Sequence, residues 1–138
     1  MNRLGIVFFL LSSNLAFSQC NLKIEVSGIK RVKGQIVVGI FNRASSFLKS
    51  GEEYRTLTVD VKQSSSEIIL PNLPKGRYAV SVYQDENSDK TCNLNFLRIP
   101  KEGYGFSRNY VPFRSAPKFN DCAFDLQKDT SIQIKLLF

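Results

Sequence analysis

Hydrophobic and polar residues alternate with a period of two along most of this chain. Apolar and polar positions exchange regularly over 22–26 and 57–61, as in half-buried strands. Gln35–Phe41 is almost continuously apolar, which indicates a central strand covered on both faces. The expected strands are 22–26, 35–41, 57–61, 67–70, 78–83, 123–126 and 131–138. This pattern predicts an all-β fold, an antiparallel β-sandwich of immunoglobulin-like or transthyretin-like type, with about seven strands and one long loop, 84–118.

A tight turn before the fifth expected strand adds a specific packing device. Pro74 and Gly76 form the turn, and Tyr78 follows at the start of the strand, as in the tyrosine corner of Greek-key sandwiches, where the hydroxyl holds the connection. Alternation also predicts which side chains face inward. The expected core comprises Leu22, Ile24, Val26, Val37, Val59, Tyr78, Val80, Val82, Ile132 and Ile134. Phe47 and Leu48 are expected to tuck under an irregular segment, 42–55.

The N-terminal segment Met1–Ser18 has the three parts of a secretory signal peptide. Arg3 supplies a positive charge, 4–11 is apolar but too short to span a bilayer, and Ala16-Phe17-Ser18 places small residues before a cleavage site at Gln19. An N-terminal strand is one alternative. A lipoprotein is another because Cys20 lies close by, although Gln19 stands where a lipobox requires Gly or Ala. We therefore expect an exported bacterial protein (periplasmic, surface-bound or secreted) with one domain, 19–138, and no further membrane span.

Composition excludes several classes of function. The formal net charge is +7, and it falls by one when Arg3 is removed. Apart from a group at 30–33, the cations are scattered singly, so no nucleic-acid partner is expected, and a loose affinity for anionic lipid or polymer is the residual interpretation. The chain contains no histidine, which removes histidine triads and histidine metal sites. No catalytic residue is therefore assigned.

The segment from Tyr83 to Asn109 carries a resemblance. Its most specific part is Asp85-Glu86-Asn87 followed by IPKEGYGFS at 99–107, with LPKGRYAVSV before it and APKFNDCAF after it. Nearly the whole chain after the leader is similar to a family of exported bacterial proteins catalogued as domain of unknown function 2141. The resemblance implies an exported β-sandwich with no assigned activity. The family usually has histidine where this chain has Gln84, and glycine where it has Lys90.

The run after Gln84 predicts a loop that binds a hard cation, most simply Ca²⁺. Oxygen-bearing side chains recur at every second position, like ligands one, three and five of a calcium loop. The candidate ligands are Asp85, Asn87, Asp89, Thr91 and Asn93. Lys90 at position six weakens the prediction, because calcium loops need glycine there for a positive φ. The alternative is an Asx-rich turn, in which these side chains bond their own backbone.

Cysteines and aromatic residues give two further candidate features. An exported protein with three cysteines favours one disulfide and one unpaired thiol; three pairings are open, and we expect Cys92–Cys122, with Cys20 unpaired. Around Tyr104 and Phe106, two glycines allow sharp turns, so Glu102, Tyr104 and Phe106 are a candidate ligand loop. The alternative is that both aromatic rings fold back and cap the sandwich.

These observations favour an exported non-catalytic binding or structural module, with a glycan, a peptide or a surface protein as partner. A small carboxylate-dependent hydrolase acting on extracytoplasmic polymers, built on Asp85, Glu86 and Glu102, is the second hypothesis. An accessory subunit of a surface assembly is the third.

Overall fold

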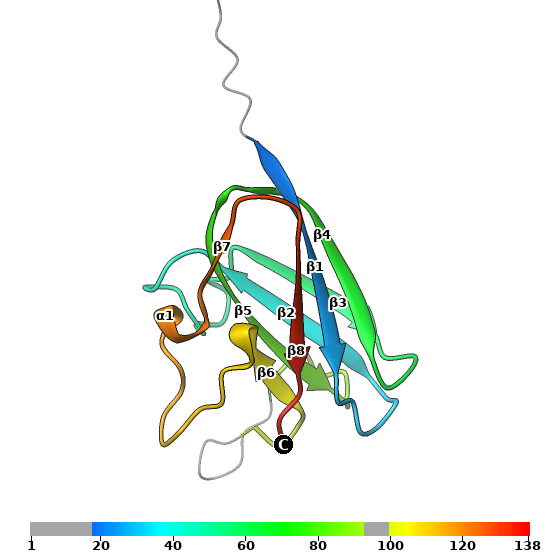
Figure 1. The fold of residues 1–138 in the computed structure, drawn as a ribbon. Coiled ribbons are helices and arrows are strands. Elements are labelled where there is room, and N and C mark those ends of the chain that lie inside the picture. The colour runs from blue at the N-terminus through cyan, green and yellow to red at the C-terminus, as the bar shows by residue number, and fades with distance from the viewer. Residues whose placement is uncertain (1–17, 93–99) are drawn as a thin grey trace, which may run out of the picture.

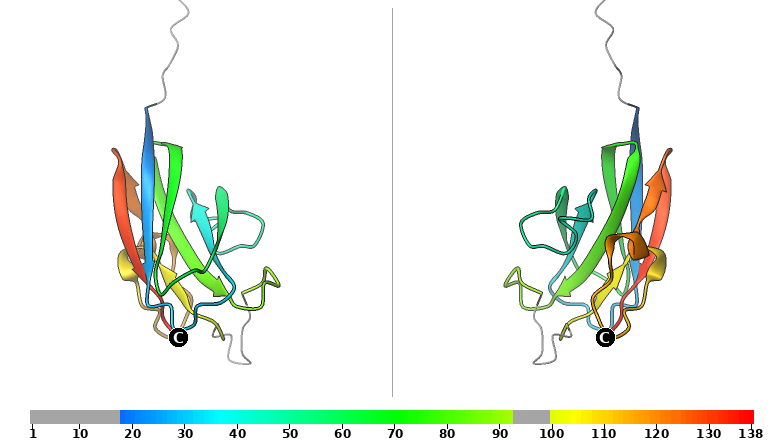
Figure 2. Two further views of the ribbon diagram at one scale, coloured as in Figure 1. Left: turned by 90° about the vertical axis from the view of Figure 1, so that its right-hand side faces the viewer. Right: turned by 90° about the vertical axis from the view of Figure 1, so that its left-hand side faces the viewer.

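A computed structural model describes residues 18–92 and 100–138. The chain forms two packed β-sheets, seen face-on in Figure 1 and from both edges in Figure 2. One sheet has the strand order β4-β1-β8 and the other β3-β2-β5-β6, with β7 paired to β5. The elements are β1 (Gln19–Ser27), β2 (Gln35–Phe41), β3 (Arg55–Asp60), β4 (Ser66–Pro74), β5 (Gly76–Asp85), β6 (Tyr104–Phe106), η1 (Ser107–Asn109), α1 (Phe119–Cys122), β7 (Phe124–Leu126) and β8 (Thr130–Lys135). The all-β sandwich expected from the period of two is confirmed.

The pairing is antiparallel except between β1 and β8, which run parallel. This exception arises because the chain crosses from the second sheet back to the first between β7 and β8. The tyrosine corner is present: the Tyr78 hydroxyl donates to the carbonyl of Pro74 at 2.7 Å. It closes the β4–β5 turn, as the Pro-x-Gly pattern predicted.

The main core lies between the sheets and matches the predicted positions with one correction. The inward-facing side chains of β1, β5 and β8 are buried, while Val59 and Ile132 pack against them partly exposed. Val37 does not belong to this core. In β2 the buried inward residues are Ile36, Val38 and Ile40, and Val37 lies on the opposite face, half-buried. Because this strand is apolar on both faces, its sequence does not show which of the two alternating sets of side chains points inward.

A second, smaller cluster explains why β2 is apolar on both faces. Phe41, Ala79, Phe119, Cys122 and Ala123 are buried on the outer side of the larger sheet. Segment 42–55 and α1 cover them, and Phe47 and Leu48 pack there as the sequence predicted. In the part of the chain that the structure describes, no helix is long and apolar enough to cross a membrane.

The long loop expected at 84–118 is broken by ordered elements. Tyr104–Phe106 forms β6 on the edge of β5, and η1 follows directly. Ser107 anchors this segment from a fully buried position, because its Oγ accepts the Val80 N–H at 2.9 Å and donates to the Cys122 carbonyl at 2.5 Å. These contacts hold the segment that follows β6, and the pairing of β6 with β5 places Glu102, two residues before β6, beside the end of β5.

Candidate functional site

The candidate site lies where β5 ends, at Asp85. This residue is fully buried, and its carboxylate accepts the backbone N–H groups of Asp89 at 3.2 Å and Lys90 at 2.7 Å. The chain reverses because Ser88 and Lys90 take positive φ values of 57° and 62°. Lys90 therefore adopts the sharp turn for which calcium loops use glycine at position six. Asp85 acts as the anchor of the loop, a role that both sequence interpretations allow.

The other predicted ligands come together, but they bond one another. Asn87 Nδ2 donates to Asp89 Oδ2 at 2.9 Å, and Asp89 Oδ1 accepts from the Thr91 N–H at 2.9 Å and from the Thr91 hydroxyl at 2.7 Å. These are the local bonds of an Asx-rich turn. Asn93 lies outside the described residues. The structure thus shows the Asx-rich turn, in which the side-chain oxygen atoms of Asp89 accept hydrogen bonds from Asn87 and Thr91.

Glu102 joins the loop from the next strand. The Gln84 N–H donates to the Gly103 carbonyl at 2.7 Å, which continues the β5–β6 ladder by one step and sets Glu102 opposite Asp85. Glu102 is only 8% exposed. Its Oε1 accepts the Glu86 N–H at 2.9 Å, whereas its buried Oε2 has no hydrogen-bond partner in the described structure. The sheet register therefore places Glu102 beside the loop.

Acidic side chains gather at this site, and few of them form ion pairs within the described residues. Glu86 pairs with Arg31 at 3.2 Å, but no ion pair to Asp85 or Glu102 is found within the described ranges. Acidic neighbours also contribute to the raised pKa values of two nearby side chains, Tyr83 and Cys92. Burial, reinforced by Asp85 and other acidic neighbours, raises the pKa of Tyr83 to about 12. Burial and the Glu102 carboxylate also raise the pKa of the Cys92 thiol.

Gln84 supports the site from the core side and was not singled out as a functional residue. Its fully buried Nε2 donates to the carbonyls of Arg31 at 2.7 Å and Lys33 at 2.8 Å, which ties the β1–β2 turn to β5. Its Oε1 is the second buried atom without a hydrogen-bond partner in the described ranges. Gly34 completes the contact: it has φ +69°, and a Cβ there would lie 2.0 Å from the Asp85 carbonyl oxygen. The signal in the sequence was Gln84 itself, which stands in place of the family's histidine.

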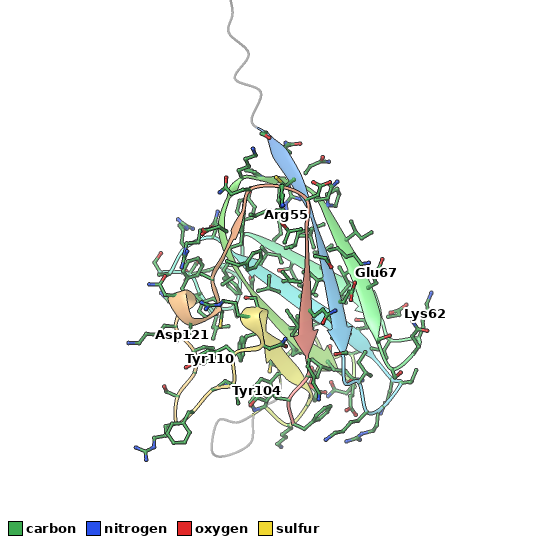
Figure 3. The ribbon with its side chains drawn as sticks, in the orientation of Figure 1. Arg55, Lys62, Glu67, Tyr104, Tyr110 and Asp121 are labelled. Atoms are coloured by element: carbon green, nitrogen blue, oxygen red, sulfur yellow. The ribbon has the colours of Figure 1, made fainter. Side chains whose placement is uncertain are left out.

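The aromatic ligand loop expected around Tyr104 is instead a strand. Tyr104 pairs with Tyr83 across β5–β6 and exchanges backbone hydrogen bonds with Leu137. Its ring centroid lies 6.0 Å from that of Phe106, and both side chains are half-buried. Figure 3 places Tyr104 near the lower end of the sandwich. Phe106 packs against the second apolar cluster, on the outer side of the larger sheet, and a ligand-binding role for this segment stays a prediction.

The expected Cys92–Cys122 disulfide is not formed, and all three cysteines are free thiols. The physical reason is placement. Cys122 is enclosed in the second apolar cluster, where burial raises the pKa of its thiol to about 11. Cys92 is half-buried beside Glu102, at the end of the acidic loop. Cys20, predicted to be unpaired, is buried in the main core.

Two buried carboxylates, Asp85 and Glu102, define the chemistry of this site. Searched over the described residues, the chain has no group of three or more His, Cys, Asp or Glu side chains arranged to hold a metal ion. Asp85 and Glu102 could supply two oxygen-rich side chains, and loop carbonyls or water would have to complete a coordination shell. Asp85 is poorly suited to acid–base chemistry because both of its oxygen atoms accept backbone N–H groups.

Comparison with known proteins identifies the family of the chain. No curated protein and no solved structure matches it. A family model described as "Uncharacterized protein conserved in bacteria (DUF2141)" matches residues 24–134, which include every strand from β2 to β7, Asp85 and Glu102. The match covers most of the chain and agrees with the resemblance carried by the 85–107 segment. The chain therefore belongs to the uncharacterised bacterial family DUF2141.

Proposed function

We propose that this protein is an exported, non-catalytic β-sandwich binding module that holds a hard divalent cation, most simply Ca²⁺, between Glu102 and the loop after Asp85. The observation that carries the proposal is the Glu102 carboxylate, which is buried beside a second buried carboxylate and has one oxygen without a hydrogen-bond partner among residues 18–92 and 100–138. Export rests on the leader-like Met1–Ser18 segment, most of which lies outside the described residues.

The energetic argument concerns an unbalanced buried charge. A carboxylate removed from water is costly unless hydrogen bonds or an opposite charge compensate it. Asp85 has two backbone donors, whereas Glu102 has one. A calcium ion accepts carboxylate and carbonyl oxygens at variable coordination numbers, so it can use Glu102 Oε2 together with water and loop oxygens. Because local partners already hold the loop side chains, we expect a weak site, with a dissociation constant of about 0.1–1 mM.

A non-catalytic role is supported by the chemistry of the available side chains. The chain has no histidine, and the buried Asp85 serves as the anchor of a turn. The hydrolase hypothesis requires one carboxylate with a free oxygen that can attack or protonate a substrate. Glu102 Oε2 is free of partners but buried, which fits a ligand-holding group better than a group that meets a polymer.

Titration of chelator-treated protein with Ca²⁺ tests the proposal. At a Ca²⁺ concentration ten times the dissociation constant, binding adds about 1.4 kcal/mol of stability, which raises the melting temperature by about 5 °C. Glu102→Gln keeps the side-chain length but removes the charge, and we expect it to abolish both the calorimetric heat and the shift.

Glu67→Gln is the matched control. Glu67 lies on β4, where it forms an exposed ion pair with Lys23 at 2.9 Å, and Figure 3 shows it on the other sheet. This variant should retain the full response to Ca²⁺. A wild-type protein that shows neither heat nor a melting shift at millimolar Ca²⁺ would reduce the loop to a structural turn.

A further inference from the structure

One end of the sandwich exposes large apolar side chains. This is the lower end in Figure 1, where β1 runs into β2 and where the chain terminates. Phe113 is 78% exposed and Val111 is 64% exposed, both in the segment between η1 and α1, which reaches the same end in Figure 1. Val32 in the β1–β2 turn and Phe138 at the C-terminus are also at least half exposed. Apolar groups gathered at one end of a molecule mark an interaction surface.

Contacts between the segments confirm that they share this end. Lys30 Nζ lies 3.9 Å from the ring centroid of Phe138, which joins the β1–β2 turn to the C-terminus. Asn109 Oδ1 accepts the Lys135 N–H at 2.8 Å, which fixes the start of the 110–118 segment beside the end of β8.

Cations flank each apolar tip. The segment 103–120 contains Arg108, Arg114 and Lys118 and no acidic residue. The turn 28–34 contains three cations, of which Arg31 pairs with Glu86 of the neighbouring acidic loop at 3.2 Å. Arg114 Cζ lies 5.0 Å from the ring centroid of Phe113, so the guanidinium and the exposed ring project together. The formal charge of the chain is +7 and falls to +6 without Arg3, and this net positive charge adds a long-range attraction toward anionic surfaces.

We propose that this end docks onto a phospholipid bilayer containing anionic headgroups, with Phe113 and Val111 entering the interface and the neighbouring cations contacting phosphates. The arrangement suits a bilayer better than a protein partner. The core of a protein interface is a continuous apolar patch, whereas these apolar tips stand on separate loops with cations beside them. A Phe ring can insert into a membrane interface next to Arg or Lys, and each cation near anionic headgroups contributes favourably to binding.

The test is co-sedimentation of the protein, purified from an exporting host, with vesicles of phosphatidylethanolamine and phosphatidylglycerol, and with vesicles of phosphatidylcholine alone. All samples contain chelator, so the outcome is independent of the proposed cation site. We expect binding to the anionic vesicles that weakens in high salt. Phe113→Ser should lower this affinity about tenfold or more, and Arg114→Gln about fivefold.

Ile69→Thr is the matched control, because Ile69 is 58% exposed on β4, in the other sheet, and should leave binding unchanged. Equal melting temperatures of the variants check that each one folds. No binding of wild type to the anionic vesicles, equal binding to phosphatidylcholine, or an unchanged affinity of Phe113→Ser would each overturn the proposal. Self-association or capture of another protein through Phe113, without vesicle binding, would also overturn it and assign the surface to a protein interface.

Discussion

Ser107 offers the sharpest test of how the segment after β6 is held. Replacing it with alanine removes one hydroxyl from a fully buried position and changes almost no volume. The Val80 N–H then loses its acceptor at 2.9 Å, and the Cys122 carbonyl loses its donor at 2.5 Å. Both groups stay buried, since β5 and α1 enclose them.

The expected loss follows from counting these orphaned groups. A buried donor or acceptor left without a partner costs about 1–3 kcal/mol, so losing two should destabilise the protein by about 2–6 kcal/mol in Ser107→Ala. Urea unfolding measures this as a lower midpoint with an unchanged slope. In a thermal melt, each kilocalorie corresponds to about 3–5 °C for a domain of this size.

Ser46→Ala is the control for the same chemical change at equal burial. Ser46 is also almost fully buried, but its hydroxyl donates only to the carbonyl of Arg43 in the same turn, at 3.2 Å. Because Arg43 is exposed, water can replace the lost donor, and we expect a cost below about 1 kcal/mol. Equal stability losses in the two variants would refute the argument that Ser107 satisfies two otherwise orphaned backbone groups.

Other predictions address the backbone, a phenol and the thiols. Gly34→Ala should prevent stable folding or cost more than about 3 kcal/mol, because its Cβ would lie 2.0 Å from a main-chain oxygen. Gly51→Ala, at φ +82° with nothing within 4 Å, should cost about 1 kcal/mol, so comparing the two variants by denaturant unfolding separates the steric clash from the φ strain. Burial raises the pKa of Tyr83 to about 12 from its ordinary 10.0, so the stability that this residue contributes is intact below pH 10 and is lost as the pH rises toward 12. Tyr83→Phe should therefore reduce the fall of the melting temperature between pH 10 and 12, and an unchanged dependence of the melting temperature on pH would contradict this. A thiol reagent at neutral pH should label Cys92 but not Cys122 in the native protein, because Cys122 is fully buried with a pKa raised to about 11; rapid labelling of Cys122 would show that α1 opens readily.

Several features of this protein follow from local sequence alone. Alternation over β1 and β5 fixes both the secondary structure and the inward face, because polar residues on one side leave only one register that buries the apolar set. The tyrosine corner is equally local: Pro74 and Gly76 define the turn, and Tyr78 reaches back over four residues. The turn after Asp85 is also encoded nearby, since short Asx side chains bond their own backbone within a few residues.

Tertiary structure decided the features that depend on distant partners. The apolar run of β2 is compatible with either register, and only the burial of Ile36, Val38 and Ile40 in the main core shows that Val37 faces away from it. The Cys92–Cys122 pair could be suggested from the sequence, but the placement of Cys122 beside Phe119 leaves both thiols free.

The candidate site itself required the sheet register. Sixteen residues separate Glu102 from the Glu86 N–H that it binds, and the three-residue strand β6 was too short for its alternation to stand out from the surrounding loop. Local patterns report backbone preference and amphipathicity over a few residues, so they predicted the loop around Asp85. Whether a second carboxylate is buried beside that loop depends on long-range strand pairing, which the sum of packing across both sheets determines.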